Sequence, residues 1–191
     1  MTDFLRKIFH GLLNKIAAFL IVLGVKPDTV TFIGLLGNML AGFLIATGKL
    51  QFGGLCALIM GPVDAVDGAL ARLSDEESRF GAFLDSVVDR YSEIALFLGL
   101  LVHAVRIDDD VLLIWTFIAA SGSVMVSYTR ARAESLGEEI KIGILTRVER
   151  YLVFVPAMIT NLPLIGMVII GVLAHVTASQ RIWQARARMM D

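Results

Sequence analysis

The chain has 191 residues, of which 57% are hydrophobic, and a mean hydropathy of +0.75. A soluble domain of this size has too little interior to bury so much apolar surface, so the composition excludes an ordinary soluble protein and predicts that much of the chain lies in lipid. The single cysteine, Cys56, excludes a disulfide framework and a cysteine-based metal site, and the net charge of −1 identifies no partner.

Residues 3–23 combine polar and apolar side chains with helical periodicity. Asp3, Lys7, His10 and Asn14 fall on one stripe of such a helix, and leucine, isoleucine and phenylalanine side chains fall on the other. This pattern favours an amphipathic helix that lies in the membrane interface. A poorly conforming transmembrane helix is the alternative.

Six apolar stretches follow, most of them close to the ~20 residues that a helix needs to cross a bilayer. They are residues 29–47, 51–72, 81–105, 110–133, 146–160 and 162–180. No linker, repeat or low-complexity tract interrupts them. The sequence therefore predicts an all-α, polytopic membrane protein with six transmembrane helices after an interfacial helix, forming a single domain over residues 1–191.

The basic residues predict the orientation of these spans. If the N-terminus lies in the cytoplasm, all of the 17 lysines and arginines except Lys49 and Arg106 fall at cytoplasmic helix ends or loops. This asymmetry follows the positive-inside rule. We expect a multi-pass protein of the inner (cytoplasmic) membrane, with both termini in the cytoplasm.

Four acidic residues, Asp64, Asp67, Asp85 and Asp89, lie inside the second and third predicted spans. Counted at 1.5 Å per residue from the shared cytoplasmic end, both pairs lie roughly 6–12 Å deep. Spacings of three and four place each pair on one helix face. Two antiparallel neighbours can therefore direct four carboxylates towards one point.

Four carboxylates at such close range repel one another and need cations to be stable. An ion-paired structural network is one solution, but no basic residue lies between Asp64 and Asp67. Ionisable groups inside a membrane indicate function by default, and all-oxygen ligands favour Mg²⁺, Mn²⁺ or Ca²⁺. We therefore favour a metal site that opens to the cytoplasm.

The stretch Asp64-x2-Asp67-Gly68-x2-Ala71-Arg72-x8-Gly81-x3-Asp85-x3-Asp89 resembles, at every position, the signature of the CDP-alcohol phosphatidyltransferases. The resemblance implies an enzyme of phospholipid biosynthesis that transfers a phosphatidyl group from a CDP-linked lipid to the hydroxyl of a polar alcohol and releases CMP. It also implies two bound divalent cations, Mg²⁺ or alternatively Mn²⁺.

Site residues carry over from this resemblance position by position. Asp64, Asp67, Asp85 and Asp89 become metal ligands, and Asp89 also becomes the general base. The nucleotide site takes Gly68, Arg72 and Ser78, together with Asp28, Thr29 and Thr31 from the segment that opens the first span. Helix capping is the alternative role for that segment.

Residues 127–155 resemble the phosphatidylinositol-phosphate synthase branch of the family, which favours inositol 1-phosphate as acceptor. Arg130, Arg150 and Arg181 fall where that branch binds the acceptor phosphate, and Thr146 departs from its usual glutamate. Arginine suits phosphate because its planar fork donates two parallel bonds. Headgroup anchoring is the alternative for these residues, and it is our expectation for Arg186 and Arg188.

Other functions remain open at this point. Glycerol 3-phosphate or another alcohol is the nearest alternative acceptor, and an intramembrane prenyltransferase or a cation transporter would also use membrane carboxylates. The expected partners are the CDP-linked lipid, the alcohol phosphate and the bilayer, with no nucleic acid. The family resemblance adds a homodimer.

Overall fold

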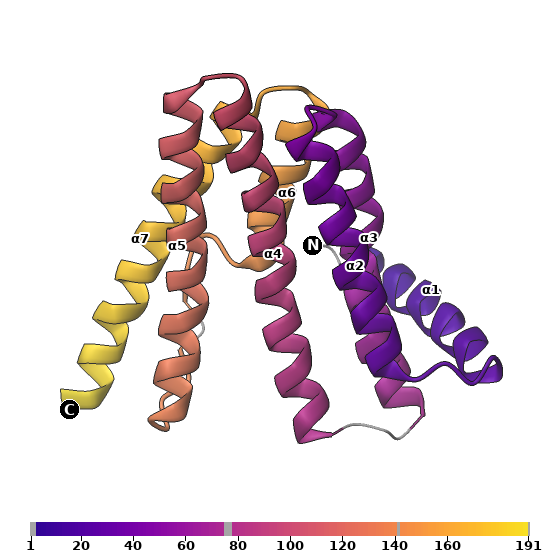
Figure 1. The fold of residues 1–191 in the computed structure, drawn as a ribbon. Coiled ribbons are helices and arrows are strands. Elements are labelled where there is room, and N and C mark those ends of the chain that lie inside the picture. Colours follow the sequence, from indigo (N-terminus) through magenta and orange to yellow (C-terminus); the bar gives the residue numbers. More distant parts are fainter. Residues whose placement is uncertain (1–2, 75–77, 141, 191) are drawn as a thin grey trace. The chain divides into compact units, whose positions relative to one another are not determined.

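The computed structural model describes residues 3–74, 78–140 and 142–190, and for residues 3–10, 12 and 64 it describes the backbone alone. This part of the chain forms seven helices and no strand (Figure 1). The helices are α1 (Asp3–Val22), α2 (Pro27–Ala46), α3 (Leu50–Leu73), α4 (Arg79–Arg106), α5 (Asp110–Ser135), α6 (Arg147–Ile159) and α7 (Pro163–Met190). Their bounds agree with the predicted elements within a few residues, except that α7 continues ten residues past its predicted end at 180.

Local chemistry explains where several helices begin. α2 and α7 start at Pro27 and Pro163, where proline's fixed φ suits the first helical position. α5 is capped by Asp109, whose Oδ1 accepts a 2.9 Å hydrogen bond from Leu112 N. The turn before α3 contains Gly48 at φ +85°, a conformation that glycine adopts without steric cost.

Four helices are long and apolar enough to cross a bilayer: α2, α3, α5 and α7. α6 has 13 residues, fewer than the ~20 that a spanning helix needs. α4 has 28 residues but includes Asp85, Asp89, Arg90 and Glu93 in its first half. The helical membrane architecture therefore agrees with the prediction, and the count of six spans stays a prediction.

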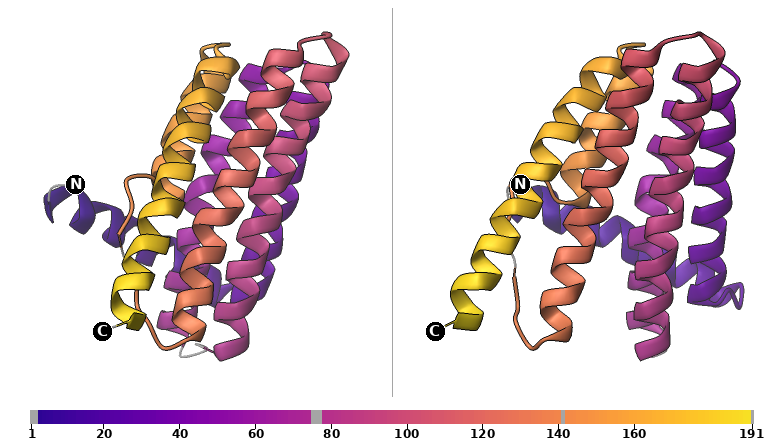
Figure 2. Two further views of the ribbon diagram at one scale, coloured as in Figure 1. Left: turned by 90° about the vertical axis from the view of Figure 1, so that its left-hand side faces the viewer. Right: turned by 60° about the vertical axis from the view of Figure 1, so that its left-hand side comes forward.

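The chain divides into two compact units. Unit 1 comprises Met1–Leu40 and Cys56–Ala95, and unit 2 comprises Ala41–Leu55 and Leu96–Asp191. In unit 1, α1 is inclined to α2 and α3 (Figure 2). Leu13 and Ala17 of α1 are buried in one cluster with Val30 of α2 and with Val66, Ala69 and Leu70 of α3. α1 thus packs directly against the helices that bear the predicted nucleotide and metal residues. Its side chains at residues 3–10 lie outside the described part, so the interfacial position of α1 stays a prediction.

Unit 2 is built on close contacts at small residues. α5 and α7 run side by side, and Gly122 of α5 lies against Ala174 and His175 of α7 (Figures 1 and 2). Such small residues allow membrane helices to approach closely. At the end where α4 turns into α5, a pocket of about 540 Å³ is lined by His103, Asp109 and Asn161 among others. Its described lining includes none of the predicted site residues.

Candidate active site

The predicted nucleotide segment and the predicted metal ligands meet in unit 1. Thr31, in the first turns of α2, and Asp67, on α3, are both buried. The Thr31 hydroxyl lies 2.7 Å from Asp67 Oδ2 and 3.2 Å from Pro27 O. The much shorter distance identifies the carboxylate as the main acceptor of its single proton. The contact fixes the orientation of the Asp67 carboxylate.

The other predicted nucleotide residues lie near the ends of their helices. Asp28 and Thr29 are exposed in the first turn of α2. Arg72 is exposed near the end of α3. A methyl group added to Gly68 would lie 3.5 Å from Nη1 of Arg72, so the guanidinium is close to this glycine. Ser78 precedes α4, and its hydroxyl accepts a 2.9 Å hydrogen bond from Gly81 N. Ser78 therefore has a capping role that the sequence analysis did not assign to it.

The predicted metal ligands occupy α3 and α4. Asp67 and Asp89 are buried and Asp85 is half-buried, whereas the side chain of Asp64 lies outside the described residues. Asp89 Oδ2 lies 3.3 Å from Arg90 Nη2. Among the described side chains, no cluster of three or more metal-binding residues is formed. Since one of the four predicted carboxylates is not described, their convergence stays a prediction.

The donor set nevertheless fits a hard divalent cation. Buried carboxylates need charge compensation, and all-oxygen sets are those that Mg²⁺ and Mn²⁺ prefer. Metal-binding carboxylates are commonly oriented by hydrogen bonds from residues that do not bind the metal themselves, and the bond from Thr31 to Asp67 is of this type.

Three arginines form the second predicted site, in unit 2. Arg150 and Arg181 are buried, at 2% and 3% exposed, and Arg130 is exposed. Arg130 and Arg150 both act electrostatically on Arg181, and Glu134 partly offsets them. Arg130 of α5 and Arg150 of α6 thus lie within electrostatic range of Arg181 of α7, and the binding of one phosphate by all three stays a prediction. Arg130 is also ion-paired with Glu134, with Nε 2.8 Å from Oε1.

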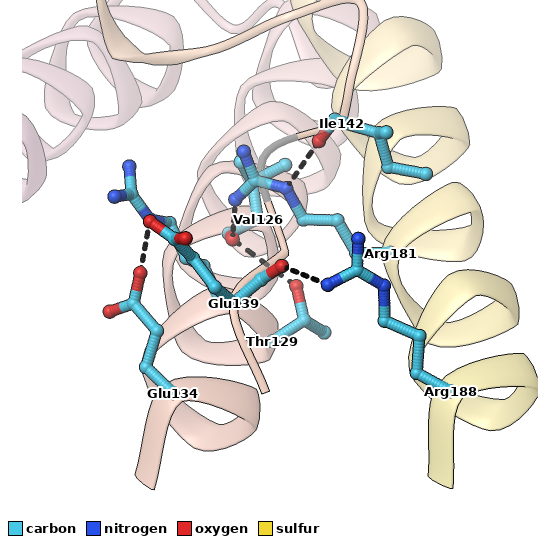
Figure 3. Close-up of polar contacts among 8 residues, drawn as sticks. Val126, Thr129, Glu134, Glu139, Ile142, Arg181 and Arg188 are labelled. Atoms are coloured by element: carbon cyan, nitrogen blue, oxygen red, sulfur yellow. Dashed lines mark hydrogen bonds and ion pairs between the residues drawn. The ribbon is translucent and has the colours of Figure 1, made fainter. Parts of the chain in front are cut away.

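Two side chains of α7 donate hydrogen bonds to backbone carbonyls of α5 and of residues that follow α5 (Figure 3). Arg181 donates from Nε to Ile142 O at 2.9 Å and from Nη1 to Val126 O at 2.5 Å. Arg188 donates from Nη1 to Glu139 O at 2.8 Å. Arg188 therefore has a protein contact in addition to the headgroup anchoring expected of it, and the anchoring stays a prediction.

A family model for the CDP-alcohol phosphatidyltransferases matches residues 25–180, a stretch that contains the predicted residues of both units except Arg181. The chain belongs to the CDP-alcohol phosphatidyltransferase family. It is an enzyme of that class. Membership of the family favours phosphatidyl transfer over the prenyltransferase and cation-transporter alternatives.

Relatives of this phosphatidyltransferase are similar to it in sequence over nearly its whole length. It is 35% identical over 178 residues to an archaetidylinositol phosphate synthase of Pyrococcus horikoshii, covering 93% of this chain and 92% of that one. It is 34% identical over 188 residues to a phosphatidylinositol phosphate synthase of Mycobacterium tuberculosis, covering 93% and 87%.

Solved structures of the Mycobacterium tuberculosis phosphatidylinositol phosphate synthase have the same fold. One with CDP-DAG bound superposes with a TM-score of 0.85 at 32% identity, covering 91% of this chain and 92% of that chain. Another, in complex with manganese and citrate, gives 0.81 at 30% identity, covering 91% and 88%.

Sequence reasoning missed the role of Thr146 in this phosphatidyltransferase. Thr146 is the N-cap of α6, its backbone N donates to Glu149 Oε2 at 2.9 Å, and its hydroxyl also contacts that oxygen. The signal was present as a threonine followed three residues later by a glutamate, which is the capping-box spacing. The departure from the usual glutamate at 146 thus has a structural reason.

Proposed function

We propose that this enzyme transfers a phosphatidyl group from a CDP-diacylglycerol-type lipid to the hydroxyl of inositol 1-phosphate and releases CMP. The observation that carries the proposal is the buried hydrogen bond between Thr31 and Asp67, which joins the predicted nucleotide segment to a predicted metal ligand. The relatives named as inositol phosphate synthases, and the one solved with CDP-DAG, support the choice of both substrates.

Residues of unit 1 bind the CDP moiety in this proposal. The two exposed residues that open α2, Asp28 and Thr29, contact the nucleotide, with Ser78 at the start of α4. Gly68 leaves room for close approach, and Arg72, whose guanidinium lies beside it, contacts phosphate. Thr31 holds Asp67 in place.

Asp64, Asp67, Asp85 and Asp89 would hold two divalent cations, Mg²⁺ or Mn²⁺. When bound, the cations neutralise charge on the pyrophosphate and on the leaving CMP. A relative solved with manganese supports this assignment.

Asp89 accepts the proton from the attacking hydroxyl of the acceptor. The hydroxyl oxygen forms a bond to the lipid-bearing phosphorus, the bond from that phosphorus to the bridging oxygen breaks, and CMP leaves with that oxygen. Because Asp89 is buried, water has little access to its carboxylate and competes less for the proton.

Arg130, Arg150 and Arg181 bind the phosphate of the acceptor. Their mutual repulsion is relieved when a phosphate dianion lies among them, and a neutral polyol would leave it in place. This difference is the physical basis for preferring inositol 1-phosphate to inositol.

The proposal also includes the membrane setting. Six helices cross the inner membrane after an interfacial α1, both termini and the site face the cytoplasm, and the enzyme is a homodimer. Support for the spans comes from the four long apolar helices, and support for the orientation from the distribution of basic residues.

Substitution of Asp89 by Asn tests the proposed chemistry. Asn is isosteric but does not accept the proton, so turnover should fall by at least ~100-fold while binding of the CDP-lipid stays measurable. Full activity in Asp89→Asn would exclude Asp89 as the general base. Loss of turnover together with loss of lipid binding would assign it to substrate binding instead.

A further inference from the structure

The described residues between α5 and α6 (136–140 and 142–146) are bound by three side chains of α7, which we call the α7 clamp: Thr177, Arg181 and Arg188. The Thr177 hydroxyl accepts a 3.0 Å hydrogen bond from Leu145 N. The two arginines donate to Ile142 O and Glu139 O (Figure 3). Spacings of 4 and 11 residues place the three side chains along one face of α7.

The described part of the connecting segment packs closely against this clamp. Gly143 has φ +140°, and a methyl group there would overlap Cγ2 of Thr177 and lie 3.6 Å from Nε and Nη2 of Arg181. Ile140 and Leu145 of the same segment are buried, as is Thr177 itself. Both branches of Thr177 are therefore used: the hydroxyl binds one backbone amide and the methyl group contacts the glycine.

Thr177 also lies beside the start of α6. Leu145, which it binds, directly precedes Thr146, the N-cap of α6. Arg150 N in turn donates a 3.1 Å hydrogen bond to Thr146 O. A short chain of backbone contacts thus links Thr177 to Arg150, whose charge acts on Arg181 of the clamp.

We propose that Thr177 and Arg188 are positioning residues for the acceptor phosphate. Without touching the acceptor, they hold the start of α6 against α7, so that Arg150 and Arg181 are spaced for one phosphate group. The inference rests on the proposed function, because it gives these residues a role at the acceptor site assigned there. A clamp of this kind sets the KM for the phosphorylated acceptor and leaves the KM for the CDP-lipid alone.

Steady-state kinetics of Thr177→Val and Arg188→Gln test the proposal, with Thr177→Ser and Arg186→Gln as matched controls. Thr177→Val keeps the shape but loses the acceptor for Leu145 N, so the KM for inositol 1-phosphate should rise roughly three- to tenfold. Arg188→Gln should also raise the KM for inositol 1-phosphate. In both, the KM for the CDP-lipid should stay within about twofold of the wild-type value. Thr177→Ser should restore the wild-type KM, and Arg186→Gln, an exposed substitution on the same helix, should leave it unchanged.

A merely structural role would give a different result. It would lower the melting temperature and the active fraction, and hence the apparent kcat, with both KM values unchanged. That outcome, or equal increases in both KM values, would overturn the proposal. Arg188 is exposed, so Arg188→Gln keeps the test decisive even if Thr177→Val does not fold.

A second measurement separates this inference from the proposed function. If no phosphorylated acceptor supports turnover by the wild type, the proposed function fails, and binding of inorganic phosphate to wild type and to both variants is compared by calorimetry. Weaker binding in Thr177→Val and Arg188→Gln, with faster hydrogen exchange at Leu145 in Thr177→Val, would retain the positioning role. Equal phosphate binding in all three proteins would overturn it.

Discussion

The Thr31 hydroxyl on α2 donates a 2.7 Å hydrogen bond to Asp67 Oδ2 on α3, and both residues are buried. This bond joins two segments that the sequence assigns to different parts of the site. A buried hydroxyl that donates to a carboxylate fixes the orientation of that carboxylate. Thr31 therefore orients Asp67, and its contact to the nucleotide stays a prediction.

Substitution of Thr31 by Val should reduce the enzyme's activity through Asp67. The change preserves shape and removes the only donor hydroxyl of that side chain, so Asp67 is less well oriented for a metal ion. Removal of a hydrogen bond to a metal-binding side chain lowers metal affinity or activity by about 10–100-fold. We expect the Mn²⁺ concentration for half-maximal activity to rise by a factor in this range, as measured by titration of CMP release.

Thr31→Ser is the matched control, because it keeps the hydroxyl and removes the methyl group. It should retain most of the wild-type response to Mn²⁺. An unchanged metal response in Thr31→Val, with weaker binding of the CDP-lipid, would instead assign Thr31 to the nucleotide.

Removal of divalent cations should abolish turnover reversibly. Buried carboxylates such as Asp67 and Asp89 lose their charge compensation when the metal is chelated. After treatment with EDTA and dialysis we expect no CMP release, and addition of Mg²⁺ or Mn²⁺ should restore it. Zn²⁺ should restore less, since an all-oxygen set suits harder cations. Undiminished activity in EDTA would contradict a catalytic metal site.

Substitution of Gly99 by Ala should destabilise unit 2. A methyl group on Gly99 of α4 would come within 2.7 and 2.8 Å of C and Cα of Gly42 on α2, where backbone atoms cannot move aside easily. Overpacking of this kind costs about 1–3 kcal/mol. The thermal unfolding midpoint of the detergent-solubilised protein should fall accordingly.

Gly11→Ala is the control for that experiment. Gly11 is an exposed residue of α1, and no described neighbouring residue has an atom within 4 Å of an added methyl group. Alanine should leave the unfolding midpoint unchanged or raise it, because it favours helix by about 0.5–1 kcal/mol over glycine. If Gly99→Ala and Gly11→Ala behave alike, the close approach of α4 to α2 is not a determinant of stability.

Local sequence patterns were sufficient to predict the helices. Apolar runs and charged helix ends are properties of neighbouring residues, and α2 to α6 begin and end within about two residues of the predicted spans. The family assignment was predictable for the same reason, since its signature occupies residues 64–89 of the chain. The same local patterns do not determine how deeply α4 and α6 lie in a bilayer, because that depth depends on lipid and on neighbouring helices.

Long-range polar contacts were not predictable from these patterns. Thr177 and Leu145 are 32 residues apart, and Arg188 and Glu139 are 49 apart. A threonine or an arginine on a helix has no sequence feature that identifies a distant backbone group as its partner. The α7 clamp therefore emerges only from the tertiary structure, whereas the capping role of Thr146 could have been predicted from Glu149 three residues later.

The most direct test of the central claim is CMP release by the purified enzyme with CDP-diacylglycerol, Mg²⁺ and a panel of acceptors. We predict negligible release without acceptor and the highest kcat/KM with inositol 1-phosphate, above glycerol 3-phosphate and far above inositol. The lipid product should contain both the diacylglycerol and the inositol phosphate. A higher kcat/KM with glycerol 3-phosphate would contradict the assigned acceptor, and no CMP release with any alcohol would contradict the proposed reaction itself.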